Sequence, residues 1–284
     1  MMNADGSDDF LAGMAASSAE RARRLRDSIS EQELLRKIAA TPAPPLIRFD
    51  PAGFDLIAEI KTVSPSSGIL ATGHTDLRTR AEAYVAAGAC AVSVLTETRR
   101  FGGCLEHLNQ VANAILPHGI PAMAKDFLVD PCQIMAARAA GAGGVLLIVR
   151  MMDDERLADM LDCAGRLGMF TLIEAFDAQD LARAHSLLDR VGTTAGTAMV
   201  GVNCRDLRTL TIDAGRLETL VDLCPADRLA VAESGMLSAA DAGRAARLGY
   251  RVGLVGTALM RTEEPGALVQ AMLVAGRAQV RRRA

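Results

Sequence analysis

The sequence predicts an α/β fold of the TIM (β/α)8 barrel class with an N-terminal helical extension, and three observations lead to it. Eight short aliphatic runs recur about every 23 to 35 residues, a spacing that fits one strand and one helix per unit. The runs are apolar throughout, which indicates strands buried on both faces, as in an all-parallel sheet. Eight such units in about 230 residues match the size of a closed barrel. A doubly wound sheet is the alternative that this pattern leaves open.

The predicted strands and helices alternate regularly along the chain. The strands are residues 55–61, 90–96, 120–125, 143–149, 169–175, 199–203, 228–234 and 251–256. Stretches rich in Ala, Leu and Arg, such as 78–88 and 131–141, separate them and predict helices. Four glycines each follow such a stretch and precede a strand, where the C′ position of a helix favours glycine. They are Gly88, Gly141, Gly168 and Gly249.

Residues 1–50 are predicted to form a helical extension ahead of a catalytic barrel domain at 51–284. Residues 14–27 and 30–40 have helical character, and the proline-rich run 41–45 breaks the second helix. The sequence leaves two placements open for the extension. In the first, it closes the bottom of the barrel or packs outside the barrel. In the second, it forms a flap beside the active-site mouth.

Composition excludes several classes of protein. The chain has 284 residues, of which 50% are hydrophobic, so it can bury a sizeable core. A net charge of -3, no Trp and two Tyr offer no basic stacking surface, and we expect no nucleic-acid partner. No segment approaches the roughly 18 apolar residues of a membrane span, so we expect a cytoplasmic protein. The six Cys form no CxxC and the four His no paired spacing, so most cysteines are expected to be small buried hydrophobes rather than metal ligands.

Polar side chains gather where the predicted strands end, which is where the active site of this fold lies. These residues are Glu59, Lys61, Lys125, Glu174, Asn203, Glu233 and Ser234. Glu59 and Lys61 lie two apart on one strand and therefore point to the same face. A structural ion pair is the alternative for any one of them. Two lysines and three glutamates at one mouth, however, indicate acid–base chemistry.

Lysine is rare in this chain, which makes two of its positions informative. It occurs only at Lys37, Lys61 and Lys125, while arginine supplies nearly all of the 31 cations. Arginine cannot release its proton in a protein, whereas a partly desolvated lysine can. Lys61 and Lys125 therefore indicate proton transfer or a Schiff base. Small residues at 233–236 and 255–258 would let backbone N–H groups approach a phosphate, which favours a phosphorylated, sugar-like substrate.

Several motifs, in order, resemble those of the indole-3-glycerol phosphate synthase family. The family's EIK…SPS.G run is matched by Glu59, Ile60, Lys61, Ser64, Pro65, Ser66 and Gly68. Further matches are SVLTETRRFGG at 93–103, KDFLVDPCQ at 125–133, NCRDL at 203–207 and ESG at 233–235. The similarity runs from about residue 45 to residue 270.

This resemblance implies a reaction without cofactor or metal. It is the ring closure of 1-(2-carboxyphenylamino)-1-deoxyribulose 5-phosphate, with loss of carbon dioxide and water, to indole-3-glycerol phosphate. Lys125 would be the general acid at the ribulose carbonyl. Glu174 would be the base of the later dehydration, with Lys61 assisting as a proton donor and as a cation for the substrate.

The resemblance also implies roles for the remaining site residues. Glu59, Asn203, Glu233 and Ser234 would orient hydroxyl groups and the two lysines. The implied substrate-binding residues are Ser64, Phe127, Arg205, Gly235, Gly256 and Thr257. Among these, Arg205 and Phe127 would contact the anthranilate end, and the two glycines with Thr257 would hold the phosphate.

Three departures from the usual family residues leave the exact substrate open. At Ala124, Cys204 and Thr257 the family commonly has different side chains, which leaves room for a paralogue acting on a substituted anthranilate in secondary metabolism. The sequence also allows a Schiff-base aldolase with Lys125 as nucleophile, or a catalytically silent barrel that serves as a partner subunit. The silent barrel is disfavoured because the sequence contains all five of the residues Glu59, Lys61, Lys125, Glu174 and Asn203. The oligomeric state stays open, with a monomer as one option.

Overall fold

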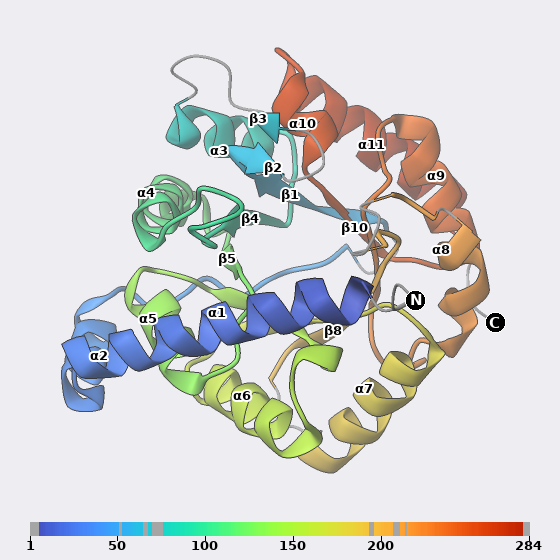
Figure 1. Cartoon of the computed structure of the whole chain (residues 1–284). Helices are drawn as coiled ribbons and strands as arrows, with labels where there is room; N and C mark the ends of the chain where they lie inside the picture. The colour runs from blue at the N-terminus through green and yellow to red at the C-terminus, as the bar shows by residue number, and fades with distance from the viewer. Residues whose placement is uncertain are drawn as a thin grey trace.

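The computed structural model shows a closed, eight-stranded parallel barrel, which confirms the predicted fold class and excludes the doubly wound sheet (Figure 1). The structure describes residues 6–50, 53–64, 68–69, 76–192, 196–206, 211–213 and 215–280. The barrel strands are β1 (Asp55–Ile60), β4 (Ala91–Leu95), β5 (Ala122–Lys125), β6 (Gly144–Ile148), β7 (Phe170–Ala175), β8 (Ala198–Asn203), β9 (Ala230–Glu233) and β10 (Val252–Val255). Each lies within a predicted run or differs from it by one residue. Around the barrel they are ordered β1-β10-β9-β8-β7-β6-β5-β4.

Helices surround this barrel and separate successive strands in sequence. They are α1 (Gly6–Ser28), α2 (Glu31–Ala40), α3 (Leu77–Ala86), α4 (Leu105–Ile115), α5 (Pro131–Ala139), α6 (Asp154–Arg166), α7 (Ala178–Val191), α8 (Gly215–Leu220), α9 (Ala239–Leu248), α10 (Thr257–Arg261) and α11 (Pro265–Gln279). A short hairpin, β2 (Val63–Ser64) and β3 (Gly68–Ile69), follows β1. The four glycines predicted at helix ends all have positive φ.

Side chains alternate between the barrel interior and the space under the helices, as the pleat of a strand requires. On β1, Leu56 and Ala58 belong to the core beneath the helices, whereas Ile57 belongs to the interior core. Every second residue of β1 faces the interior, so Ile57 is followed there by Glu59 and then by Lys61. On β7, Leu172 is followed in the interior by Glu174. The interior is therefore apolar in its lower layers and charged at the carboxyl ends of the strands.

The N-terminal helix α1 lies across the mouth of the barrel at the carboxyl ends of the strands (Figure 1). Its residues Leu11 and Met14 pack with the interior core, and Phe10 lines the cavity at the mouth. Helix α2 packs against α5, and its Leu34 joins the core beneath the helices. Of the two placements left open, the structure therefore supports the flap. The division of the chain at residue 50 stays a prediction.

Two expectations from composition can be compared with the described part of the chain. All six cysteines are free, and five of them are buried, as expected for small hydrophobic residues. Within the described ranges, no helix combines the length and apolar character that crossing a membrane would need.

Candidate active site

One cavity of about 360 Å³ occupies the mouth of the barrel. Twelve of the predicted site residues line it: Glu59, Lys61, Lys125, Phe127, Glu174, Asn203, Arg205, Glu233, Ser234, Gly235, Gly256 and Thr257. The structure thus brings together residues that are as much as 198 positions apart in the sequence (59 to 257). The side chain of Ser64, and the motif residues Pro65, Ser66 and Leu207, lie outside the described residues. The catalytic and binding roles of the site residues, within the cavity and outside the described ranges, stay predictions.

Glu59 lies between the two lysines of the cavity. Its Oε1 is 2.8 Å from Lys61 Nζ, and its Oε2 is 3.9 Å from Lys125 Nζ. Burial alone would raise the pKa of Glu59, but the charges of Lys61 and Lys125 outweigh burial and lower that pKa. Glu59 is therefore a carboxylate that contacts Lys61 directly and attracts Lys125 from a longer distance.

Lys125, at the end of β5, also faces the carboxylate of Glu174 on β7. The Nζ of Lys125 is 3.9 Å from Glu174 Oε2, which leaves room for its protons to be directed at a substrate. Burial would lower the pKa of Lys125, but the carboxylates of Glu174 and Glu59 outweigh burial and raise it. Lys125 therefore rests as an ammonium group, the form that can donate a proton.

A chain of hydrogen bonds orients Glu174. Asn203 Nδ2 donates to Glu174 Oε2 at 3.0 Å, which fixes the orientation of the Asn203 amide. Its Oδ1 in turn accepts from Ser234 Oγ at 2.8 Å and from the backbone N–H of Arg205 at 2.9 Å. The ends of β7, β8 and β9 are thereby tied together at the level of the carboxylate.

Glu233, at the end of β9, differs from Glu59 in its affinity for a proton. Only 1% of the residue is exposed. Burial, followed by the negative charge of Glu174, raises the pKa of Glu233 well above its ordinary value. The cavity thus contains one carboxyl group of low proton affinity, Glu59, and one of high proton affinity, Glu233.

The backbone that follows Glu233 turns sharply. Ser234 has φ 68° and is the one non-glycine residue with positive φ among the described residues, and Gly235 follows with φ 80°. A non-glycine residue in this region costs about 1–3 kcal/mol, and such residues cluster at functional sites. At the end of β10, a Cβ on Gly256 would overlap the carboxylate of Glu59. Gly256 is therefore required for the position of Glu59, whether or not it also contacts a phosphate.

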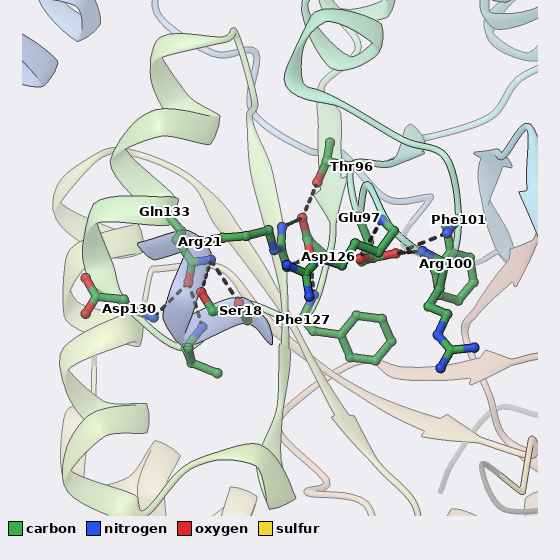
Figure 2. A network of polar contacts seen from close by, with 12 residues as sticks. Ser18, Arg21, Thr96, Glu97, Arg100, Phe101, Asp126, Phe127, Asp130 and Gln133 are labelled. Atoms are coloured by element: carbon green, nitrogen blue, oxygen red, sulfur yellow. Dashed lines mark hydrogen bonds and ion pairs between the residues drawn. The ribbon is translucent and has the colours of Figure 1, made fainter. Parts of the chain in front are cut away.

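A second buried polar network adjoins the cavity, and no pattern in the sequence predicts it. Figure 2 shows Arg21 of α1 directed at Asp126, which immediately follows Lys125. Arg21 donates to both carboxylate oxygens of Asp126, at 2.8 and 2.6 Å. The same carboxylate accepts from Thr96 Oγ1 at 3.1 Å and from the backbone N–H of Phe127 at 2.7 Å. The network fixes the backbone between Lys125 and Phe127.

Glu97 organises the loop between β4 and α4 beside this network (Figure 2). Its carboxylate accepts hydrogen bonds from the backbone N–H groups of Arg99, Arg100 and Phe101, at 2.9, 2.6 and 3.0 Å. The loop presents the Phe101 ring to Phe127, with ring centroids 6.0 Å apart.

Phe10 and Phe101 line the cavity together with Phe127, and neither was a predicted site residue. The Phe10 ring meets that of Phe127 edge-on, with centroids 6.1 Å apart. Phe101 lies within the motif at 93–103, which could have indicated it, whereas no short-range signal points to Phe10. The cavity is thus lined by an aromatic wall of Phe10, Phe101 and Phe127 as well as by a cluster of charged groups, a lining suited to a substrate with an aromatic ring and anionic groups.

Comparison with known proteins agrees with this geometry. The model of the family described as "Indole-3-glycerol phosphate synthase" matches residues 16–272. A protein of that name from Nocardioides sp. is 41% identical over 265 residues, covering 93% of this chain and 96% of that relative. One from Micrococcus luteus is 42% identical over 257 residues, covering 88% and 91%. A 3-hexulose-6-phosphate synthase structure from Salmonella typhimurium has a TM-score of 0.59 at 15% identity, covers 80% of this chain and 100% of that one, and shows the fold alone.

Proposed function

The chain belongs to the indole-3-glycerol phosphate synthase family, and from that membership we propose how its cavity catalyses the family's reaction. The substrate is a phosphorylated small molecule, 1-(2-carboxyphenylamino)-1-deoxyribulose 5-phosphate. Ring closure with loss of carbon dioxide and water gives indole-3-glycerol phosphate in tryptophan biosynthesis. The chain is thus a carbon–carbon lyase.

The observation that carries the assignment of roles is the position of Lys125 between two carboxylates. Its Nζ lies 3.9 Å from oxygens of both Glu59 and Glu174, too far for either to bind its protons tightly. Since the raised pKa keeps Lys125 protonated, it donates a proton to the ribulose carbonyl oxygen. The ring carbon that bears the carboxylate then attacks the carbonyl carbon. Loss of carbon dioxide from that ring carbon restores aromaticity.

The second stage is the loss of water, and it needs a base and an acid. Glu174, held in orientation by Asn203, accepts the proton that leaves the new five-membered ring. Lys61 donates a proton to the departing hydroxyl group, which leaves as water. Glu59 holds Lys61 at 2.8 Å and so places this second acid.

The walls of the cavity suit the two ends of this substrate. Arg205 and Phe127 contact the anthranilate end, and Phe10 and Phe101 extend that aromatic wall. Gly235, Gly256 and Thr257 contribute the phosphate side. We further propose that the chain acts in the cytoplasm without cofactor, metal or nucleic acid. Size-exclusion chromatography coupled to light scattering would test whether it is a monomer.

Indole fluorescence gives a direct test of the activity. Purified protein mixed with the anthranilate-derived ribulose phosphate should produce fluorescent indole-3-glycerol phosphate without any added cofactor. Absence of product from folded protein would contradict the proposal. Adducts of ring-substituted anthranilates, offered in competition, would show a paralogue if one of them were preferred.

Replacing Glu174 by Gln separates the two stages, because glutamine keeps the shape but lacks the basic oxygen. In single turnovers, carbon dioxide release should precede indole formation by a lag that the unmodified protein does not show. Equal slowing of both signals, or no slowing of either, would show that Glu174 is not the base of the dehydration.

A further inference from the structure

The carboxyl group of Glu233 is buried without an N–H or hydroxyl donor. The residue is 1% exposed, and within the described part of the chain neither of its oxygens accepts a hydrogen bond from such a group. An ionised carboxylate that is removed from water and left without a donor is strongly destabilised. Glu59, by contrast, is in contact with Lys61 at 2.8 Å.

Three cations of the cavity, Lys61, Lys125 and Arg205, are engaged mainly with carboxylates other than Glu233. Lys61 pairs with Glu59, and Lys125 lies 3.9 Å from Glu59 and from Glu174. The charge of Arg205 acts on Glu59. Among the described residues, no ammonium or guanidinium nitrogen forms an ion pair with Glu233, and Lys125 attracts it only from a longer distance.

The charged group that acts most strongly on Glu233 is another acid. After burial, the negative charge of Glu174 is the largest cause that raises the pKa of Glu233, and the charge of Glu59 on β1 raises it less. Two ionised carboxylates in contact repel each other, whereas a single proton between them turns the contact into a short, charge-assisted hydrogen bond.

The backbone leaves space for the carboxyl groups of Glu233 and Glu174 to approach each other. Strand β8 lies between β7 and β9, with Gly201 beside Glu174 in the register and Asn203 beside Glu233. A Cβ on Gly201 would overlap Glu233 Oε1. The absence of a side chain at this one position of β8 lets the carboxyl group of β9 reach across the strand towards that of β7.

We propose that Glu233 rests in its protonated form, that it shares this one proton with Glu174, and that Gly201 is the positioning residue that allows the two carboxyl groups to meet. The cations that line the mouth, Lys61, Lys125, Arg205 and Arg261, then outnumber its ionised carboxylates, Glu59, Asp126 and Glu174. The surplus of one positive charge favours the entry of an anionic substrate. The inference concerns the same cavity as the proposed function, but its tests need no substrate, so each can fail without the other.

Infrared spectroscopy of protein carrying ¹³C-labelled glutamate tests the protonation state. At neutral pH the labelled protein should show the carbonyl stretch of a protonated carboxyl group, and Glu233→Gln should remove it. Glu97→Gln is the matched control. Glu97 is fully buried but accepts three backbone hydrogen bonds, so this change should remove only a carboxylate band.

Two results would overturn the proposal. One is the absence of any protonated glutamate band in the unsubstituted protein at neutral pH, a measurement that does not depend on how a variant folds. The other is a Glu233→Gln difference spectrum that loses a carboxylate band, as in the control. Gly201→Ala should shift or abolish the protonated band, and an unchanged band would remove Gly201 from the proposal.

The pH dependence of stability gives an independent test with a defined sign. An acid whose pKa is raised by folding contributes most below its unfolded value, near 4.5, and loses that contribution as pH rises towards the folded value. Glutamine has no such titration, so Glu233→Gln should raise the melting temperature at neutral pH, by an amount that grows with pH. If the melting temperatures of the variant and of the unsubstituted protein differed by the same amount at every pH, this result would contradict a shared proton.

Discussion

Two networks of buried charge meet at the end of β5, and they are built in opposite ways. Asp126 accepts four hydrogen bonds, two of them from Arg21 at 2.8 and 2.6 Å, so that its carboxylate is fully engaged. Lys125, one residue earlier, has its Nζ 3.9 Å from each of two carboxylates. A network whose partners are all satisfied fixes the shape of a segment, whereas one with long contacts keeps its donors available for a substrate.

The comparison explains why adjacent residues have such different roles. Lys125 is the last residue of β5 and faces Glu59 and Glu174 in the cavity, whereas Asp126, directly after the strand, is held by Arg21 of α1 and by Thr96. In the closed network, Asp126 is satisfied by Arg21, Thr96 and the backbone of Phe127, and this fixes the backbone next to Lys125. In the open network, Lys125 lies 3.9 Å from its two carboxylates, and its position depends on that fixed backbone. Changes in the open network should therefore affect turnover, and changes in the closed network should affect stability.

The largest effect is expected for Lys125→Arg, which keeps the charge of the open network but removes the transferable proton. General acid catalysis contributes about 10²–10⁴-fold, so turnover should fall by that order while substrate still binds. Lys37→Arg, on the exposed surface of α2, is the matched control and should leave turnover unchanged. Near-normal turnover in the Lys125 variant would reduce this residue to an electrostatic contact.

A smaller effect is expected for Gly256→Ala, which places a methyl group where the carboxylate of Glu59 now lies. Displacing Glu59 moves both lysines from their positions, and a shift of about 1 Å can lower turnover about 10²-fold. In Gly253→Ala, on the preceding strand β10, the new methyl group meets the flexible end of Met236 at 2.7 Å, so this change should lower turnover less. A loss of substrate affinity with unchanged turnover would instead assign Gly256 to phosphate binding alone.

The closed network should respond in stability. Arg21→Met leaves the Asp126 carboxylate buried without its cation, and we expect a loss of about 2 kcal/mol, less than for a fully buried pair because Arg21 is 21% exposed. Denaturant unfolding would measure it. If stability were unchanged and only turnover fell, the distinction between the two networks would be wrong.

The smallest effect is expected for Arg26→Met on the same helix. Arg26 pairs with Asp130, but its side chain is 56% exposed, so its loss should cost less than about 1 kcal/mol. Arg26→Met is thus a control: it also removes an ion pair of α1, but one whose residues do not line the cavity. An effect equal to that of Arg21→Met would show that burial does not distinguish the two pairs.

Local pattern in the sequence predicts the open network well and the closed one poorly. Glu59 and Lys61 are two apart on an apolar strand, so the alternation of side chains alone places both in the barrel. Arg21 and Asp126 are 105 residues apart, and no periodicity relates a residue of the first helix to the end of the third predicted strand. The need for glycine at 201 and 256 likewise depends on carboxyl groups that arrive from neighbouring strands. The close packing of side chains from neighbouring strands, rather than the local conformational preference of the chain, requires glycine at those positions.

The burial of the cysteines has a practical consequence for labelling the native protein. Burial raises the pKa of Cys132 to about 12 and those of Cys163 and Cys204 to about 11, which makes these thiols poor nucleophiles. Cys104 is the one cysteine that is partly exposed, and it stands at the N-cap of α4, directly after the loop that Glu97 organises. A maleimide dye or spin label would therefore attach first at Cys104, without any engineered residue. Its signal would show whether the loop that carries Phe101 changes when ligands enter the mouth.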